Sequence, residues 1–296
     1  MSQDIIPAPV RRPTKEDIFF VEPCARPRHA AAAWYNYYKL LQFRFPGREL
    51  RFLGKSTLGK NILPHPDIER QYMKRNVDLN EITDGRFYTV NDMVRADCQD
   101  CVGCSKCCHE MVDTIILDPL DIFRLTKTLN KNFDALLASG KTELNVVDGI
   151  VLPNLKLQED TKRCAFLNDA GRCTVHSARP GFCRMFPLGR YYADRSFSYI
   201  LQTKECPKAR TKIKVARWLD TGLLPQNQKF VGEWHYFLED LATALTDTDN
   251  ETAHRVQLYL LHAFYRTEYR VPDEAGFYKE FDTRLAKAKT LLPSAP

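Results

Sequence analysis

The chain has 296 residues, of which 44% are hydrophobic and 27% charged, as in an ordinary folded globular protein. The net charge of +6 is modest, and we interpret the one dense basic run, residues 204–214, as a solvated helix face, so nucleic-acid binding is not expected. No stretch approaches the roughly 20 apolar residues of a membrane helix, and the first residues lack the basic start and apolar run of a signal peptide. We therefore expect a cytoplasmic protein that does not enter a membrane.

The first region, residues 1–96, has no role that its sequence identifies. Aromatic residues at helical spacing predict a helix near residues 30–43, and stripes of this kind usually belong to a core. Residues 54–61 nearly fit a phosphate-binding loop, but Asn61 replaces the Ser or Thr that would hold Mg²⁺, and prolines follow where a helix should run. We therefore interpret that segment as a surface turn.

The second region, residues 97–210, carries one clear helix start. A strand-like apolar run at residues 114–117 leads to Asp118, which can cap free amide groups, and to Pro119, which suits the first helical position. Asp121 favours the positive end of the helix dipole. A helix beginning at Pro119 is therefore expected.

Two hairpins are predicted in the same region. An Asp-Gly pair between two β-branched runs indicates a hairpin over residues 146–151. A second hairpin over residues 191–197 would return the chain so that Cys206 lies near Cys183.

The third region, residues 211–296, is expected to be helical and to pack on the cysteine-bearing region. Apolar residues recur at helical spacing in three stripes: Phe230, Trp234, Phe237, Leu238, Leu241 and Leu245; Val256, Leu260, Ala263 and Phe264; Phe277, Phe281, Leu285, Ala288 and Leu292. The expected fold is α+β, with a loop-rich cysteine core, short β-hairpins and flanking helices.

Cysteine is the residue type that stands out. Nine of the ten cysteines lie between residues 98 and 206, and clustered cysteines in the cytoplasm bind metal more often than they form disulfides.

The first block contains Cys98, Cys101, Cys104, Cys107, Cys108 and His109. A tight loop with this spacing can aim several thiolates at one centre. Adjacent side chains tend to diverge, so the Cys107–Cys108 pair can serve two centres. Part of the block also has the ferredoxin-type spacing, which supports a cubane cluster.

The second block contains Cys164, Cys173, Cys183 and Cys206. A turn at residues 168–171 can bring its first two thiolates together. A centre made of four thiolates and either Zn²⁺ or a [4Fe–4S]²⁺ cluster has a net charge of −2. Basic side chains beside the cysteines in sequence can offset that charge: Lys106, Arg172, Arg179 and Arg184.

The number of metal centres stays open. Eight cysteines are the candidate ligands: Cys101, Cys104, Cys107, Cys108, Cys164, Cys173, Cys183 and Cys206. One four-ligand site would leave four of them unused, and two sites would use all eight. Cys98, His109 and His176 are open alternatives, although histidine is more often a surface or packing residue. Cys24 is interpreted as a lone thiol.

The combined motif resembles the YkgJ-type cysteine-cluster family, also described as a zinc- or iron-chelating domain. The residues that carry the resemblance are C-x2-C-x2-C-C at 101–108, then Cys164, and the run from Cys173 through Arg179-Pro180 to Cys183-Arg184. Residues 117–125 are similar to the segment that follows the double cysteine in many members. The resemblance covers residues 98–206 and implies metal binding.

Three functions compete. We prefer an iron–sulfur protein, with a [4Fe–4S] cluster and an electron-transfer or cluster-dependent role. Because the family includes flagellin lysine N-methylases, the resemblance also implies the option of an S-adenosylmethionine-dependent enzyme, although the sequence shows no recognisable site for that cofactor. The third option is a structural zinc protein whose helices bind a partner. Cysteine ligands suit zinc and iron–sulfur clusters alike, and a protein partner or protein substrate is expected in each case.

Overall fold

The computed structural model describes residues 78–98, 104–110, 115–158, 160–208 and 211–292. These residues belong to one unit that includes residues 71–296. The helix expected near residues 30–43, the turn at 54–61, Cys24 and Cys101 all lie outside the described residues. The regional boundaries near residues 97 and 211 stay predictions.

The first predicted hairpin is confirmed and is longer than the sequence indicated. Strands β2 (Thr142–Val147) and β3 (Ile150–Leu155) pair antiparallel. The turn residues Asp148 and Gly149 have φ values of 48° and 78°. Positive φ at both positions is what a two-residue turn of type I′ requires, and its twist matches that of the strands.

The second predicted hairpin is also confirmed. Strands β4 (Leu188–Ala193) and β5 (Ser196–Leu201) pair antiparallel around Asp194 and Arg195, which both have positive φ. Tyr88 adds a bridge on β5 through Tyr199. This hairpin lies in the chain between Cys183 and Cys206.

A third strand pair was not predicted. β1 (Met93–Asp97) pairs antiparallel with β6 (Thr211–Lys214), and helix α7 (Val215–Leu219) follows directly. The inward residues Val94 and Ala96 of β1 are almost fully buried. The two ends of the cysteine region are therefore held side by side.

The predicted helix start at Pro119 is confirmed as α4 (Pro119–Leu129). The Asp118 carboxylate accepts the Asp121 N–H at 2.8 Å, and the Asp121 carboxylate accepts the Asp118 N–H at 3.2 Å. This reciprocal arrangement is a capping box, and it satisfies two amide groups that the helix cannot pair internally. In the strand-like run before it, the described residues 115–117 pair with β3 through an isolated bridge from Ile116 to Asn154 and two further backbone hydrogen bonds.

The C-terminal region is helical, as predicted. It contains α8 (Leu224–Leu245), α9 (Asn250–Leu261), the π-helical turn η3 (His262–Arg266) and α10 (Glu274–Leu291). Their facing aromatic side chains are in ring contact with one another: Phe230, Trp234, Phe237, Phe264, Phe277 and Phe281. These residues come from the three stripes that the sequence shows.

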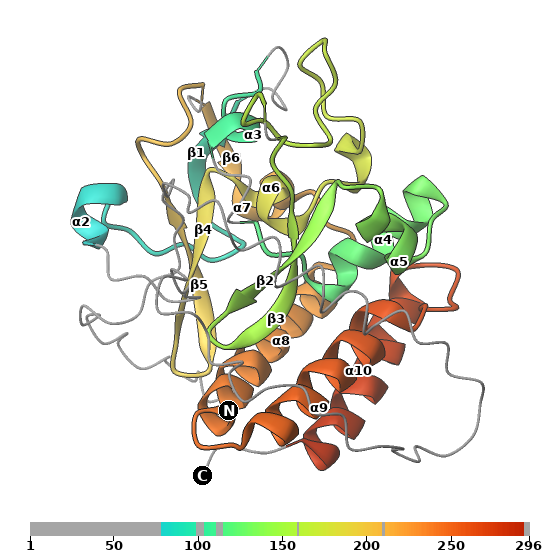
Figure 1. The fold of residues 1–296 in the computed structure, drawn as a ribbon. Helices are drawn as coiled ribbons and strands as arrows, with labels where there is room; N and C mark the ends of the chain where they lie inside the picture. Colours follow the sequence, from blue (N-terminus) through green and yellow to red (C-terminus); the bar gives the residue numbers. More distant parts are fainter. Residues whose placement is uncertain (1–77, 99–103, 111–114, 159, 209–210, 293–296) are drawn as a thin grey trace, which may run out of the picture. The chain divides into compact units, whose positions relative to one another are not determined.

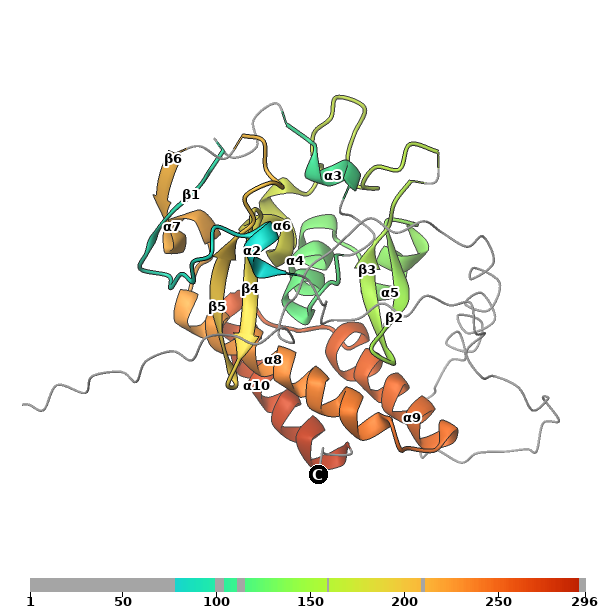
Figure 2. The same cartoon turned by 90° about the vertical axis from the view of Figure 1, so that its left-hand side faces the viewer.

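Short helices complete the unit: α2 (Leu79–Ile82), α3 (Cys107–Glu110), α5 (Phe133–Ala138), the 3₁₀ turn η2 (His176–Ala178) and α6 (Gly181–Met185). Figures 1 and 2 both place α3 at the end of the unit away from α8, α9 and α10. In the described part of the chain, no helix is long and apolar enough to cross a membrane.

We predict that Phe281→Ala lowers the free energy of unfolding by about 3–5 kcal/mol, because Phe281 has no exposed surface and its removal leaves a cavity among other rings. Urea unfolding of metal-free protein measures the change. Leu291→Ala is the control, since Leu291 is 58% exposed and should change stability by less than about 0.5 kcal/mol. Equal effects of the two substitutions would contradict the packing described here.

Candidate metal centre

Six cysteines line one cavity of about 320 Å³: Cys104, Cys107, Cys108, Cys164, Cys173 and Cys183. They come from both cysteine blocks, so the structure brings together the two parts of the predicted motif. The rest of the wall is mainly apolar and includes Phe166, Phe182 and Trp218. None of the eight described cysteines is joined in a disulfide.

The first block enters the cavity on a tight turn. Cys108 N–H donates to the Ser105 carbonyl at 2.9 Å, which starts the single turn of α3. Cys164 N–H then donates to the Cys108 carbonyl at 2.7 Å. This backbone hydrogen bond joins the two blocks directly.

The second block folds into a narrow loop that returns on itself. Leu167 and Cys173 form an isolated antiparallel bridge. Between them, Gly171 N–H donates to the Asn168 carbonyl, and Gly171 has a φ of 68°, which a glycine adopts without strain. The predicted turn is therefore present, and it places Cys164 and Cys173 on the same wall.

Cys183 reaches the cavity from α6. The preceding 3₁₀ turn η2 ends at Ala178, and Pro180 leads into α6 without a side-chain cap. Arg184, the next residue, is 8% exposed; it donates to the Ser177 carbonyl at 3.0 Å and to the Asp220 carbonyl at 3.0 Å.

The remaining candidates occupy different positions. Cys206 packs against an apolar cluster that includes Cys98 and Met185 of α6, and is not among the side chains that line the cavity. His176 does line the cavity, with its Nε2 atom 2.8 Å from Arg179 Nη1. His109 is exposed beside Ser105.

The adjacent cysteines of the first block do not diverge, contrary to our expectation from the sequence. A hydrogen bond between their side chains lowers the pKa of Cys107 and raises the pKa of Cys108. The negative charge of an ionised Cys206 would raise the pKa of Cys107, so the Cys206 side chain lies near Cys107. Because the side chains of Cys107 and Cys108 are in contact, both sulfurs can face the same centre.

Burial raises the pKa of three further thiols in the cavity, those of Cys164, Cys173 and Cys183. It brings the pKa of Cys164 to about 11 and also raises the pKa values of Cys173 and Cys183. Charge on neighbouring cysteines adds to each shift, because two thiolates at close range repel one another. A bound cation removes this repulsion, so the donor set fits a metal centre.

Positive side chains surround the sulfurs, as the sequence indicated. Arg172, Arg179 and Arg184 line the cavity, while Lys106 is exposed and is not among the lining residues. These guanidinium groups offset the charge of a thiolate centre.

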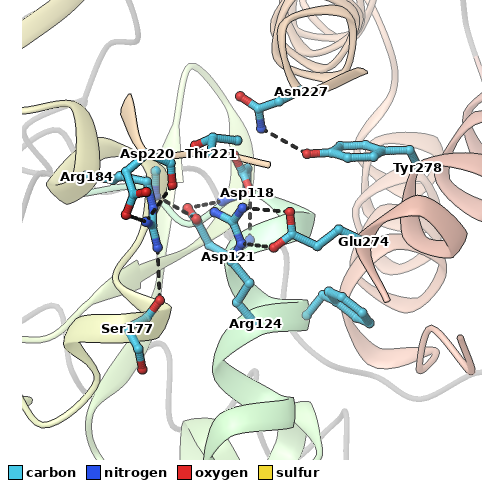
Figure 3. Close-up of polar contacts among 12 residues, drawn as sticks. Asp118, Asp121, Arg124, Ser177, Arg184, Asp220, Thr221, Asn227, Glu274 and Tyr278 are labelled. Atoms are coloured by element: carbon cyan, nitrogen blue, oxygen red, sulfur yellow. Dashed lines mark hydrogen bonds and ion pairs between the residues drawn. The ribbon is translucent and has the colours of Figure 1, made fainter. Parts of the chain in front are cut away.

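A buried polar cluster lies against α6 and links it to the helical region (Figure 3). Asp121 Oδ1 accepts the Gly181 N–H at 2.7 Å, and Arg124 donates two hydrogen bonds to Glu274 of α10, at 2.7 and 2.9 Å. Burial, reinforced by the charge of Asp118, raises the pKa of Asp121 to about 8. The sequence identified Asp118 as a helix cap and Asp121 as favourable at the positive end of the helix dipole, but it gave no sign of the contact with Gly181.

Within the described ranges, no three or more Cys, His, Asp or Glu side chains are arranged closely enough to hold a metal ion as they stand. The six thiols face the cavity from its wall instead. A single zinc ion needs sulfur atoms about 2.3 Å away, so the loops must close to form a mononuclear site.

Comparison with family models gives one match. Residues 100–207 match CxxCxxCC, a family described as "Putative zinc- or iron-chelating domain". This confirms the family resemblance and supports zinc or iron chelation; the description names neither a cluster type nor S-adenosylmethionine. Searches of the curated proteins and of the solved structures found no match.

We predict that metal affinity rises with pH between pH 6 and 8. Cys164, Cys173 and Cys183 have raised pKa values, so they are protonated near pH 7 and binding must displace their protons. Each displaced proton should strengthen binding about tenfold per pH unit. Zinc competition with a chelator at several pH values measures the slope, and calorimetry in buffers of different ionisation enthalpy counts the protons. A pH-independent affinity would contradict this prediction.

Proposed function

We propose that the cysteine domain holds an iron–sulfur cluster, of the [4Fe–4S] type, and that the protein has a redox or cluster-dependent role. The observation that supports this most is the cavity of about 320 Å³ with six thiols on its wall. A structural zinc site closes four ligands tightly around one ion. Six thiols around a larger space suit a polynuclear centre better.

The surroundings of the thiols also support the proposal. Phe166, Phe182 and Trp218 contribute apolar wall. Exclusion of solvent and hydrogen bonding around the sulfurs are the means by which a protein sets a cluster's potential. Arg184, buried beside Cys183, supplies positive charge that stabilises the more negative, reduced form of such a centre.

The candidate ligands are the six cysteines that line the cavity, of which a [4Fe–4S] cluster takes four. Cys101 lies outside the described residues and Cys206 lies near Cys107, so both remain candidate ligands of the same or a second centre. A bound cluster would supply one-electron redox chemistry. The chain's own part is to supply thiolates, to exclude water and to offset charge.

Metal analysis of anaerobically purified protein tests the proposal. We expect a brown protein that contains iron and acid-labile sulfide, with the broad visible absorption of thiolate–iron charge transfer. A colourless protein with stoichiometric zinc would instead make the domain a structural zinc module. A protein with neither metal would contradict chelation altogether.

Substitution of single ligands should remove the metal. We predict that Cys104→Ser and Cys183→Ser each lose most of the bound metal, because both side chains line the cavity and serine is a poor ligand for a soft metal centre. Iron and zinc content per chain is the measurement. Cys24→Ser is the control and should keep wild-type metal content; full metal in both cavity variants would refute the ligand assignment.

A further inference from the structure

We propose that Asp121 is a positioning residue for the metal ligand Cys183: it fixes the start of α6 by accepting the Gly181 N–H. This inference rests on the proposed metal-binding function and holds for either zinc or iron. Asp121 is not one of the cysteines of the motif; it lies in the segment of residues 117–125, between the two cysteine blocks.

The contact matters because it satisfies the N–H at the start of α6, whereas the hydrogen bonds from Arg184 to the Ser177 and Asp220 carbonyls hold the helix further along. The helix has five residues, too few to be stable alone. Pro180 at its start forms no side-chain cap. The bond of 2.7 Å from Gly181 N–H to Asp121 Oδ1 is therefore the side-chain contact that fixes this end, and Cys183 follows two residues later.

Asp121 is itself held rigidly. Its Oδ2 atom accepts the Asp118 N–H, so one oxygen completes the capping box of α4 while the other reaches α6. Arg124, one turn further along α4, forms its two hydrogen bonds with Glu274. A continuous series of contacts thus runs from α10 through α4 to the helix that carries the ligand (Figure 3).

Bulk water cannot take over the role of the carboxylate. Asp121 is 2% exposed, and the space beside it is a cavity of about 10 Å³, which holds about one water molecule at most. Arg184 and Arg190 line the same cavity, and the Nε atom of each is buried without a hydrogen-bond partner. The cap of α4 uses Asp121 Oδ2 and does not need its second oxygen.

Position 181 offers a matched pair of substitutions. Gly181→Ala keeps the N–H, and its Cβ would lie 3.7 Å from Asp121 Oδ1, an ordinary contact. Gly181→Pro removes the N–H and places a ring carbon against the carboxylate. Proline suits the first position of a helix, and the ψ of 151° at Pro180 is compatible with a following proline, so α6 can still form.

Binding of cobalt(II) to the full-length, metal-free chain is the readout. Chelator competition gives the affinity, and thiolate-to-cobalt charge-transfer absorption reports how the sulfurs are arranged. We expect Gly181→Ala to bind within about twofold of wild type, and Gly181→Pro and Asp121→Ala to bind about 10- to 100-fold more weakly, with altered absorption. The cobalt affinity of Asp121→Asn should lie between those of Gly181→Ala and Asp121→Ala, because the asparagine amide oxygen can still accept the Gly181 N–H.

Asp249→Ala is the control for lost stability, because it removes a helix cap from α9, where Asp249 accepts the Thr252 N–H at 2.9 Å. It should leave the affinity and the absorption unchanged. The positioning role is overturned if Gly181→Pro and Asp121→Ala bind cobalt like wild type, or if Asp249→Ala weakens binding as much as they do. Wild-type protein that takes up no cobalt overturns metal binding itself. If Asp121→Ala does not fold, the cobalt affinities of Gly181→Ala and Gly181→Pro test the positioning role on their own.

Discussion

The hydrogen bond from Cys164 N–H to the Cys108 carbonyl is the contact on which the candidate site depends. It joins two cysteine blocks that are separated in sequence by α4, α5 and the β2–β3 hairpin. Because the bond uses only backbone atoms, both side chains stay available for a metal. The segment between the two blocks must fold so that its two ends meet at this bond. The capping box that starts α4 and the Asp148–Gly149 turn set the path of the chain within that segment.

Much of this fold could be predicted because its signals are local. A cap at Asp118, an Asp-Gly turn and apolar stripes each act within one element, and each prediction was confirmed. The pairing of β1 with β6 could not be predicted, since two short strands far apart in sequence carry no shared signal of register. For the site, the sequence predicted that the two blocks converge. The contact between Cys107 and Cys108 and the contact from Asp121 to Gly181 depend on tertiary packing, which no spacing rule describes.

The helical region contributes the apolar core that stabilises the fold, and the cysteine region carries the candidate metal ligands. Rings from α8, η3 and α10 form an extensive apolar core, so the chain does not rely on a metal for all of its folding energy. The ion pair from Arg124 to Glu274 then connects this core to α4, with the arginine side chain only 10% exposed. The cysteine loops can consequently remain short and irregular, as ligand-bearing loops usually are.

The hydrogen bond between Cys107 and Cys108 also affects how readily the metal-free chain is oxidised. This hydrogen bond lowers the pKa of Cys107, and a lower pKa increases the fraction of thiolate, which is the species that oxidants attack first. Cys164 lines the same cavity and has a thiol that could form a disulfide with an oxidised Cys107. In the metal-free chain, oxidation therefore competes with metal for the same sulfur atoms.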